Sequence, residues 1–267
     1  MLTNLCDTHT HTLYSRHAYS TIRENVLEAA EVGLELLGSA DHYSCMLFGD
    51  QHMRNFQYFI NYGAWPEEWE GVRLLHGCEA DIVDLEGHLF GHDIPVDIEI
   101  NGAPLQYPTT LKKHVFKNCD YVYASIHDRS FSKDAPIAQT TQMYVNALQD
   151  AKVLGLCHLG RSAVPFDMCE VVSEAKRLNK LIEINVHSLE FSRPQVDADC
   201  QKLAETCAEM GCKIFVSTDA HICTDIGKFE PALAMLEKID FPQELVATTN
   251  KETFLRAIED AKIPPAR

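Results

Sequence analysis

Short apolar runs alternate along the chain with longer segments in which apolar residues recur at helical spacing. Several of these runs are apolar almost throughout, which is typical of strands buried on both faces of a parallel sheet. The runs extend over Leu5–Thr10, Leu36–Ala40, Arg73–Val83, Tyr121–Ile126, Val153–Cys157, Leu181–Val186 and Lys213–Thr218. We predict a β-strand at each of these places.

The segments between the runs carry helix signals. Thr21 followed by Glu24 is a capping box for a helix that extends to about Val32, with Gly33 just past its end. Further helices are predicted at Val171–Leu178 after the acidic start Asp167 and Glu170, at Asp197–Met210, at Glu230–Lys238 and at Lys251–Asp260. Strands that alternate with helices predict an α/β barrel or a doubly wound sheet.

The length and composition fit one barrel domain over residues 1–267. The chain has 267 residues, of which 46% are apolar, and a barrel of this length is ordinary for a single domain. No apolar run reaches the length of a membrane span, and no basic region followed by an apolar stretch precedes Asp7. We therefore expect a cytoplasmic protein with no membrane partner.

Two further features allow more than one interpretation. The aromatic-rich stretch 45–71 is interpreted as a helix and loop packed on the barrel, with a lid or substrate wall as the alternative. The ten scattered cysteines contain no Cys-x-x-Cys pair and are interpreted as small buried apolar residues. Cys78 and Cys157 each adjoin a candidate metal ligand on a strand, so alternation predicts that both thiols point to the opposite face.

Side chains of metal-ligand type lie near the ends of the predicted strands. They are His9, His11, His17, His42, Glu79, His127, His158, Asp219 and His221. Each one alone is weak evidence, but the C-terminal ends of barrel strands meet at one face, where the working residues of such folds lie. A hydrolytic zinc site uses about three protein ligands. The whole set therefore predicts two or three ions in one pocket, and clustered ions are suited to cleaving phosphate esters.

The remaining histidines are interpreted differently. Ordinary surface or partly buried positions are expected for His52, His76, His88, His92 and His114. His187 shares a strand face with Glu183 and Asn185, so it is kept as a candidate for contact with the substrate.

The formal net charge of −16 restricts the partners of the chain. An acidic surface repels duplex nucleic acid and argues against a non-specific nucleic-acid binder. It does not exclude a small anionic substrate, because three divalent ions carry six positive charges against the two negative charges of Glu79 and Asp219. We expect a locally positive pocket inside an acidic shell.

The order of these ligands resembles the PHP (polymerase and histidinol phosphatase) superfamily, in particular its small stand-alone bacterial phosphoesterases. The resemblance rests on Asp7-Thr8-His9-Thr10-His11-Thr12, His17, Ala40-Asp41-His42, Gly77-Cys78-Glu79-Ala80, His127, His158 and Ser217-Thr218-Asp219-Ala220-His221. It covers essentially the whole chain. It implies a distorted seven-stranded (β/α)7 barrel, similar to a TIM barrel, with a trinuclear metal site.

The resemblance also implies how three ions would be held. The implied groups are His9, His11, Glu79 and Asp219 for the first ion, Glu79, His127 and His158 for the second, and His17, His42 and His221 for the third. Zinc is the expected metal, with manganese or iron as alternatives. Independently of the family, ligation rich in imidazole favours zinc or a similar transition metal over magnesium or calcium.

We predict that the chain hydrolyses a small phosphate monoester with a metal-activated hydroxide. Metal binding lowers the pKa of water from about 15.7 toward 7, so the nucleophile exists at neutral pH. The residues assigned to catalysis are Glu79, Asp219 and His221. Arg129, Arg161 and Arg193 follow predicted strands and are candidates for binding phosphate, because guanidinium groups bind phosphate in a bidentate manner.

Alternatives to this function stay open. The substrate could be histidinol phosphate specifically, or a nucleotide or oligonucleotide end. An amidohydrolase-type enzyme also begins with His-x-His and ends with an aspartate, but it does not explain His17, His42 and His221. A non-catalytic metal-binding module is the alternative from another class. Asp7 also has two interpretations, as a carboxylate that orients a ligand histidine or as an acceptor for backbone hydrogen bonds.

Overall fold

The computed structural model describes residues 1–190 and 193–266. Parallel strands lie side by side in one sheet within these ranges, in the order β1 (Cys6–Thr10), β2 (Leu36–Ser39), β5 (Val72–Asp81), β8 (Tyr121–Ser125), β9 (Val153–Leu156), β10 (Leu181–Asn185) and β11 (Ile214–Ser217). Every predicted strand is confirmed, with ends that differ by two residues at most.

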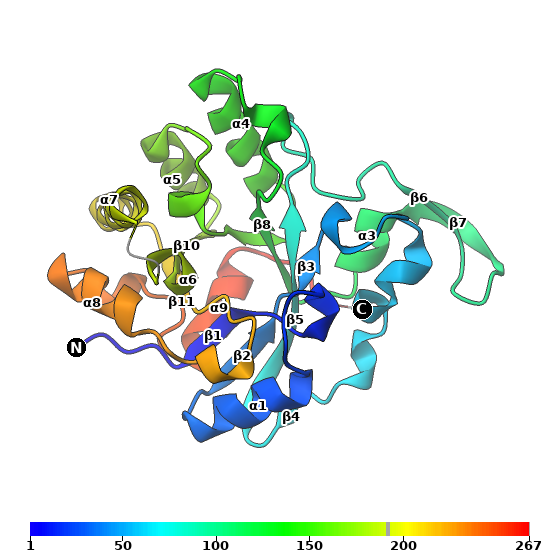
Figure 1. Ribbon diagram of the computed structural model, residues 1–267, viewed down its shortest axis with the longest axis horizontal. Coiled ribbons are helices and arrows are strands. Elements are labelled where there is room, and N and C mark those ends of the chain that lie inside the picture. The colour runs from blue at the N-terminus through cyan, green and yellow to red at the C-terminus, as the bar shows by residue number, and fades with distance from the viewer. Residues whose placement is uncertain (191–192, 267) are drawn as a thin grey trace.

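The sheet curves into a nearly closed barrel. Its edge strands β1 and β11 meet only near their C-terminal ends, where Thr10 forms a parallel bridge with Ala220. The backbone N–H of His11 donates to the carbonyl of Ala220 at 2.9 Å, and that of Asp219 donates to the carbonyl of His9 at 2.9 Å. The distorted seven-stranded barrel predicted from the sequence is therefore confirmed (Figure 1).

The helices lie around the barrel, between its strands along the chain or, for the last two, after the final strand (Figure 1). They are α1 (Ile22–Glu31), α2 (Gln57–Ile60), α3 (Leu111–Phe116), α4 (Ile137–Leu148), α5 (Met168–Arg177), α6 (Val186–Leu189), α7 (Pro194–Met210), α8 (Glu230–Lys238) and α9 (Lys251–Asp260). The predicted capping box of Thr21 and Glu24 begins α1. Helix α4 was not predicted, because Pro136 gives it no side-chain cap and Thr140 and Thr141 have low helix propensity.

Shorter elements complete the chain. Strands β3 (His42–Tyr43) and β4 (Glu68–Trp69) both pair with β5, and β6 (Pro95–Ile98) and β7 (Pro104–Thr110) form a hairpin that projects from the barrel (Figure 1). Single 3-10 turns occur at Leu13–Ser15, Cys45–Leu47, Met53–Phe56, Tyr62–Ala64, Ser130–Ser132, Leu159–Arg161, Cys223–Asp225 and Gln243–Leu245. In stretch 45–71, Phe56 and Phe59 are fully buried, so the packing interpretation is confirmed.

Large side chains fill the barrel below the C-terminal ends of the strands. Tyr123 stacks on Phe215 from the far side of the barrel, with ring centroids 4.3 Å apart. Phe254 of α9 packs edge-on against Tyr121 and belongs to the same buried cluster. Helix α9 therefore closes the N-terminal end of the barrel and leaves the C-terminal end for polar groups. No helix in the described part of the chain is long and apolar enough to cross a membrane.

Candidate metal centre

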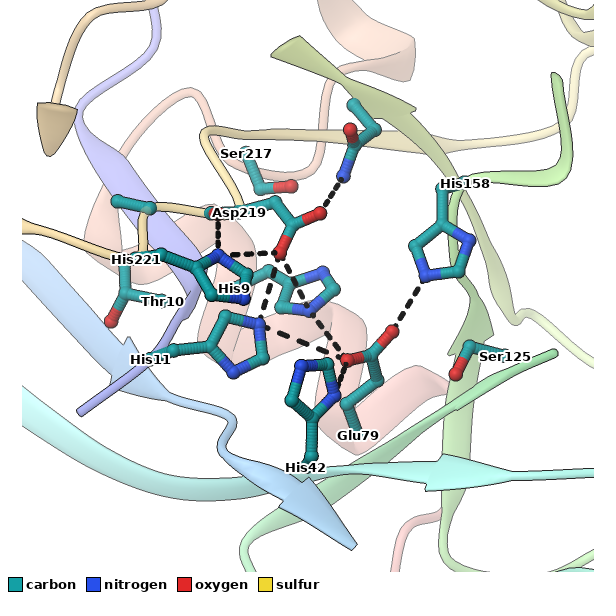
Figure 2. Close-up of polar contacts among 12 residues, drawn as sticks. His9, Thr10, His11, His42, Glu79, Ser125, His158, Ser217, Asp219 and His221 are labelled. Atoms are coloured by element: carbon teal, nitrogen blue, oxygen red, sulfur yellow. Dashed lines mark hydrogen bonds and ion pairs between the residues drawn. The ribbon is translucent and has the colours of Figure 1, made fainter. Parts of the chain in front are cut away.

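The C-terminal ends of the strands bring all the candidate ligands to one place. Figure 2 shows His9, His11, His42, Glu79, His158, Asp219 and His221. His9 lies on β1 and Glu79 lies on β5, and the segments after β1, β2, β8, β9 and β11 supply His11, His17, His42, His127, His158, Asp219 and His221. His9 and His11 are completely buried, and Glu79 and Asp219 are almost so. The carboxylates of Glu79 and Asp219 lie between the imidazole rings.

Glu79 connects imidazoles from three different strands. Strand alternation turns its side chain into the barrel, while Cys78 packs outside. Its Oε2 lies 2.6 Å from Nδ1 of His42, and its Oε1 lies 2.7 Å from Nε2 of His158 and 3.6 Å from Nε2 of His127. One carboxylate thus faces ligands on both of its oxygens, as a bridging group between two ions would.

Asp219 serves a second group of imidazoles. Its Oδ1 lies 3.0 Å from Nε2 of His11 and 3.7 Å from Nε2 of His9. A third group forms around His17, whose Nε2 lies 3.2 Å from Nε2 of His42 and 3.0 Å from Nε2 of His221. Ligands that share one zinc ion at about 2.0–2.1 Å lie roughly 3–3.5 Å apart. The distances within these groups fit ligation of divalent ions.

The charges also favour cations here. Burial opposes the charge of Glu79, but nearby imidazoles, His127 first, outweigh it and hold its pKa well below the ordinary value. The pKa of Asp219 is likewise held well below its ordinary value against the effect of burial. Burial lowers the pKa of both His11 and His42 to about 3, so these rings are neutral and keep a lone pair for a metal.

A buried nitrogen without a partner gives an independent test of the fit. Nε2 of His9 has no hydrogen-bond partner among the described residues, and it lies 3.5 Å from Oε2 of Glu79 and 3.7 Å from Oδ1 of Asp219. Leaving such a group unsatisfied costs about 1–3 kcal/mol. A cation between these atoms would satisfy all three, so the residues present fit a metal centre.

Two carboxylates that the sequence did not single out hold the ligand imidazoles. Oε1 of Glu183 lies 2.7 Å from Nδ1 of His9, and its Oε2 accepts the backbone N–H of His158 at 2.6 Å. Oδ1 of Asp81 lies 2.6 Å from Nδ1 of His127. Alternation along β5 and β10 turns both acids into the barrel, and this alternation is the sequence signal that could have identified them.

Two aspartates fix the backbone around the site. Asp41 accepts hydrogen bonds from the backbone and hydroxyl of Thr12 and from the hydroxyls of Ser15 and Tyr58. Asp7 accepts the backbone N–H groups of Thr218 and Gly227. For Asp7 this supports the backbone-acceptor interpretation, because the carboxylate next to Nδ1 of His9 is Glu183.

The structure corrects the interpretation of Cys157. Its Sγ, a ring nitrogen of His9 and a carboxylate oxygen of Glu183 lie within 4.8 Å of one another, so the thiol faces the barrel interior. Strand β9 ends at Leu156, and His158 has left-handed backbone with φ 36°, so alternation does not extend to this pair. Burial raises the pKa of the Cys157 thiol well above its ordinary value, which keeps it protonated.

The candidate phosphate-binding residues lie in different surroundings. Arg161 enters the site, where its guanidinium donates to Oδ2 of Asp219 at 2.6 Å. Arg193 is exposed at the residue before α7. His187 lies at the rim, with its ring centroid 6.1 Å from that of His221 and its Nδ1 2.9 Å from Glu190.

Arg129 borders a cavity of about 510 Å³ that begins at His127. Its guanidinium donates to the carbonyl of Ser162 at 3.3 Å, which holds it across the cavity. The lining is completed by Asp128, Ser130, Ser132, Lys133, Ala163, Val164 and Pro165. Lys133 was not predicted, since a lone lysine in a loop carries no sequence signal. A volume of this size suits a small ligand beside the metal centre.

The family follows from comparison with known proteins. A model of the PHP domain matches residues 7–182, which is more than half of the chain. The chain belongs to the PHP family. Within this family, a probable phosphatase of Clostridium botulinum strain Hall is 36% identical over 256 residues, covering 96% of this chain and 95% of that protein. A probable phosphatase of Caldanaerobacter subterraneus subsp. tengcongensis is also 36% identical, over 96% and 91% of the two chains.

Solved structures show that this PHP chain shares the fold of more distant proteins. The histidinol phosphate phosphatase of Lactococcus lactis subsp. lactis Il1403, in complex with zinc, L-histidinol and phosphate, superposes with a TM-score of 0.59. It is 18% identical, and the match covers 91% of this chain and 95% of that one. A putative histidinol phosphatase from Listeria monocytogenes gives a TM-score of 0.51 at 14% identity, over 84% of this chain and 97% of that one.

Proposed function

We propose that this protein is a metal-dependent phosphatase that hydrolyses small phosphate monoesters at a site of three divalent ions, with zinc as the first choice. The observation that carries the proposal is the convergence of seven imidazoles and two buried carboxylates at the C-terminal end of the barrel. Membership of the PHP family and relatives named probable phosphatases support the same activity.

The ions would be held by overlapping groups. The groups proposed are His9, His11, Glu79 and Asp219, then Glu79, His127 and His158, then His17, His42 and His221. When bound, such ions lower the pKa of water toward about 7 and neutralise phosphoryl charge. Glu79 would belong to two of these groups and hold them next to each other. Arg161 stabilises the charge of Asp219 through the 2.6 Å contact between their side chains. His221 would complete the side of the site that faces the rim.

The cavity beside His127 supports a small anionic substrate. Arg129 and Lys133 place two positive charges on its wall, while the carboxylate of Asp128 accepts the backbone N–H of Ser130 at 2.8 Å. Guanidinium and ammonium groups favour phosphate over neutral groups. We therefore assign the cavity to the part of the substrate next to the transferred phosphoryl group.

The first test replaces the proposed bridging carboxylate. Glu79→Gln is expected to lower kcat/KM by more than about 100-fold, because loss of several kcal/mol of charge stabilisation corresponds to that factor. Elemental analysis of the purified variant should show less bound metal per chain. Glu67→Gln is the matched control, since Glu67 is exposed near the opposite end of β5. Normal turnover and metal content in Glu79→Gln would exclude the bridging role.

A substrate panel separates the proposed activity from its alternatives. Phosphate release is measured from histidinol phosphate, nucleoside monophosphates, bisphosphorylated nucleotides and oligonucleotide ends, beside amides and lactones. Turnover of monoesters alone supports the proposal. Turnover of amides or lactones instead would favour an amidohydrolase, and a metal-loaded protein inert on the whole panel would favour a binding module.

Arg129 provides a test on the substrate side. Arg129→Ala is expected to raise KM by roughly 10- to 100-fold, because a hydrogen bond to a charged group contributes about 1.5–3 kcal/mol. Metal content should stay at the wild-type value, since the guanidinium of Arg129 donates to the carbonyl of Ser162, which is not one of the proposed ligands. Steady-state kinetics with the best substrate of the panel measures this, and an unchanged KM would remove Arg129 from the substrate site.

A further inference from the structure

A second cluster of metal-ligand side chains lies outside the centre described above, in the loop that follows β5. Nδ1 of His88 lies 2.8 Å from Oδ2 of Asp84. The rings of His88 and His92 stack with centroids 4.4 Å apart and planes inclined by 7°. One ligand atom from each of these three residues lies within 4.8 Å of the others. The sequence spacing had predicted two ordinary surface histidines, whereas the loop places them side by side.

The backbone of this loop is held in place. The N–H of Val83 donates to the carbonyl of His88 at 2.9 Å, and the N–H of Phe90 donates to the carbonyl of Asp81 at 2.8 Å. Gly87, with φ +80°, lets the loop lie against α4, where a Cβ would collide with the helix backbone. Ligands presented by a fixed backbone lose less entropy when an ion binds.

The chemical type of the ligand atoms in Asp84, His88 and His92 indicates which class of ion would bind. Two imidazoles and one carboxylate suit zinc or a similar transition metal, whereas magnesium and calcium prefer oxygen ligands. The side chains of His88, Asp84 and His92 are 51%, 31% and 27% exposed, so an ion has access from solvent and room for a water ligand. Asp84 and His88 form a 2.8 Å hydrogen bond, so their ligand atoms need to separate only slightly to share one ion.

His92 gives a second, independent observation. Its Nδ1 is shielded from solvent and has no hydrogen-bond partner in the described part of the chain. The nearest acid, Oδ1 of Asp93, lies 3.8 Å away, which is too long for a hydrogen bond. A pair of histidines that merely shared a proton with Asp84 would leave this nitrogen unexplained.

We propose that Asp84, His88 and His92 form a peripheral binding site for one divalent ion of the zinc class. This site is separate from the centre around Glu79, and it does not depend on the proposed phosphatase activity. It has a structural consequence for that centre. Phe90 in the same loop is bonded to the backbone of Asp81, whose side chain contacts His127, so the ion stabilises the end of β5.

Equilibrium dialysis of metal-free protein against zinc, followed by elemental analysis, tests the proposal. His88→Ala/His92→Ala is expected to bind one ion fewer per chain than the wild type. His52→Ala is the control, because His52 is exposed and belongs to neither cluster, and it should bind as many ions as the wild type. Equal stoichiometry in the double variant and the wild type would overturn the proposal.

Two further measurements keep the result unambiguous. Circular dichroism reports whether the double variant folds, and if it does not, Asp84→Asn replaces it in the same comparison. Anomalous scattering at the zinc edge should show a peak between the three side chains in crystals of the metal-loaded protein, and no peak there would contradict the site. The test compares the number of ions bound per chain by the wild type and by the double variant. If the centre around Glu79 bound no metal, both numbers would fall equally and the difference of one ion would remain.

Discussion

Individual carboxylates fix the ring orientation of imidazoles in the centre. Glu183 contacts Nδ1 of His9 at 2.7 Å and accepts the hydroxyl of Ser217 at 2.5 Å with the same oxygen, while its other oxygen holds the backbone of His158. The Nε2 of His9 is thereby left for a metal. A carboxylate on the far nitrogen fixes both the tautomer and the orientation of a ligand histidine.

This role makes Glu183 a testable positioning residue. Glu183→Gln is expected to weaken metal binding by about 10- to 100-fold, which is the usual effect of losing such a partner. The cause is that the amide is uncharged and donates on one side, so it cannot accept both from His9 and from the backbone of His158. Isothermal titration of the metal-free variant with zinc measures the affinity. The outcome that would contradict the role is wild-type affinity in a folded Glu183→Gln chain.

At the scale of elements, the strand ends depart from regular geometry where the ligands lie. His158 and Asp219 both have left-handed backbone, with φ of 36° and 58°. Non-glycine residues in this region cost about 1–3 kcal/mol each, and they persist where surrounding bonds hold them. Here the left-handed backbone directs the side chains of His158 and Asp219 toward the C-terminal end of the barrel interior, while Tyr123 and Phe215 fill the barrel beneath them.

Helix α9 supports this arrangement from the other end of the barrel. Phe254→Ala is expected to lower the free energy of unfolding by about 3–5 kcal/mol, because a fully buried aromatic ring is removed and a cavity remains. Urea denaturation measures the change, with Arg256→Ala on the exposed side of α9 as the control. Metal stoichiometry of the folded variant should be unchanged, since Phe254 lies at the closed end. A loss of less than about 1 kcal/mol in the free energy of unfolding would contradict the role of α9 in closing the N-terminal end of the barrel.

At the scale of the whole molecule, the net charge of −16 contrasts with a centre built for cations. The buried acids of the centre repel one another unless positive charge lies between them. An ion that binds only the folded state stabilises it by RT ln(1 + [M]/Kd), about 2.7 kcal/mol at a concentration of 100 Kd. We therefore expect metal binding and folding stability to be coupled in this chain.

Removal of metal tests that coupling. Protein treated with a chelator is expected to unfold at a lower Tm than metal-loaded protein, and added zinc should restore the Tm in a concentration-dependent manner. Differential scanning calorimetry measures both. Added zinc should raise the Tm of metal-free Glu79→Gln by less than it raises that of the wild type, because the variant lacks the proposed bridging carboxylate. Identical Tm values with and without metal would mean that ions do not bind the folded state selectively.

Much of the architecture could be read from local patterns. Apolar runs predicted every barrel strand because strands buried on both faces need such runs, and Thr21 with Glu24 predicted the start of α1 because capping is local. Helix α4 and the inward thiol of Cys157 could not be read in this way. The first is stabilised by its buried face, and the second results from a backbone conformation that alternation does not describe.

The sequence by itself determined where the ligand-bearing strands lie along the chain and the chemical type of the ligands, because periodicity and side-chain chemistry are properties of short stretches. Tertiary structure alone decided which atoms face each other. Glu183 meets His9 across 174 residues of sequence, and Asp219 meets His11 across 208. Such contacts depend on how strand ends and loops pack in three dimensions, which no local pattern encodes.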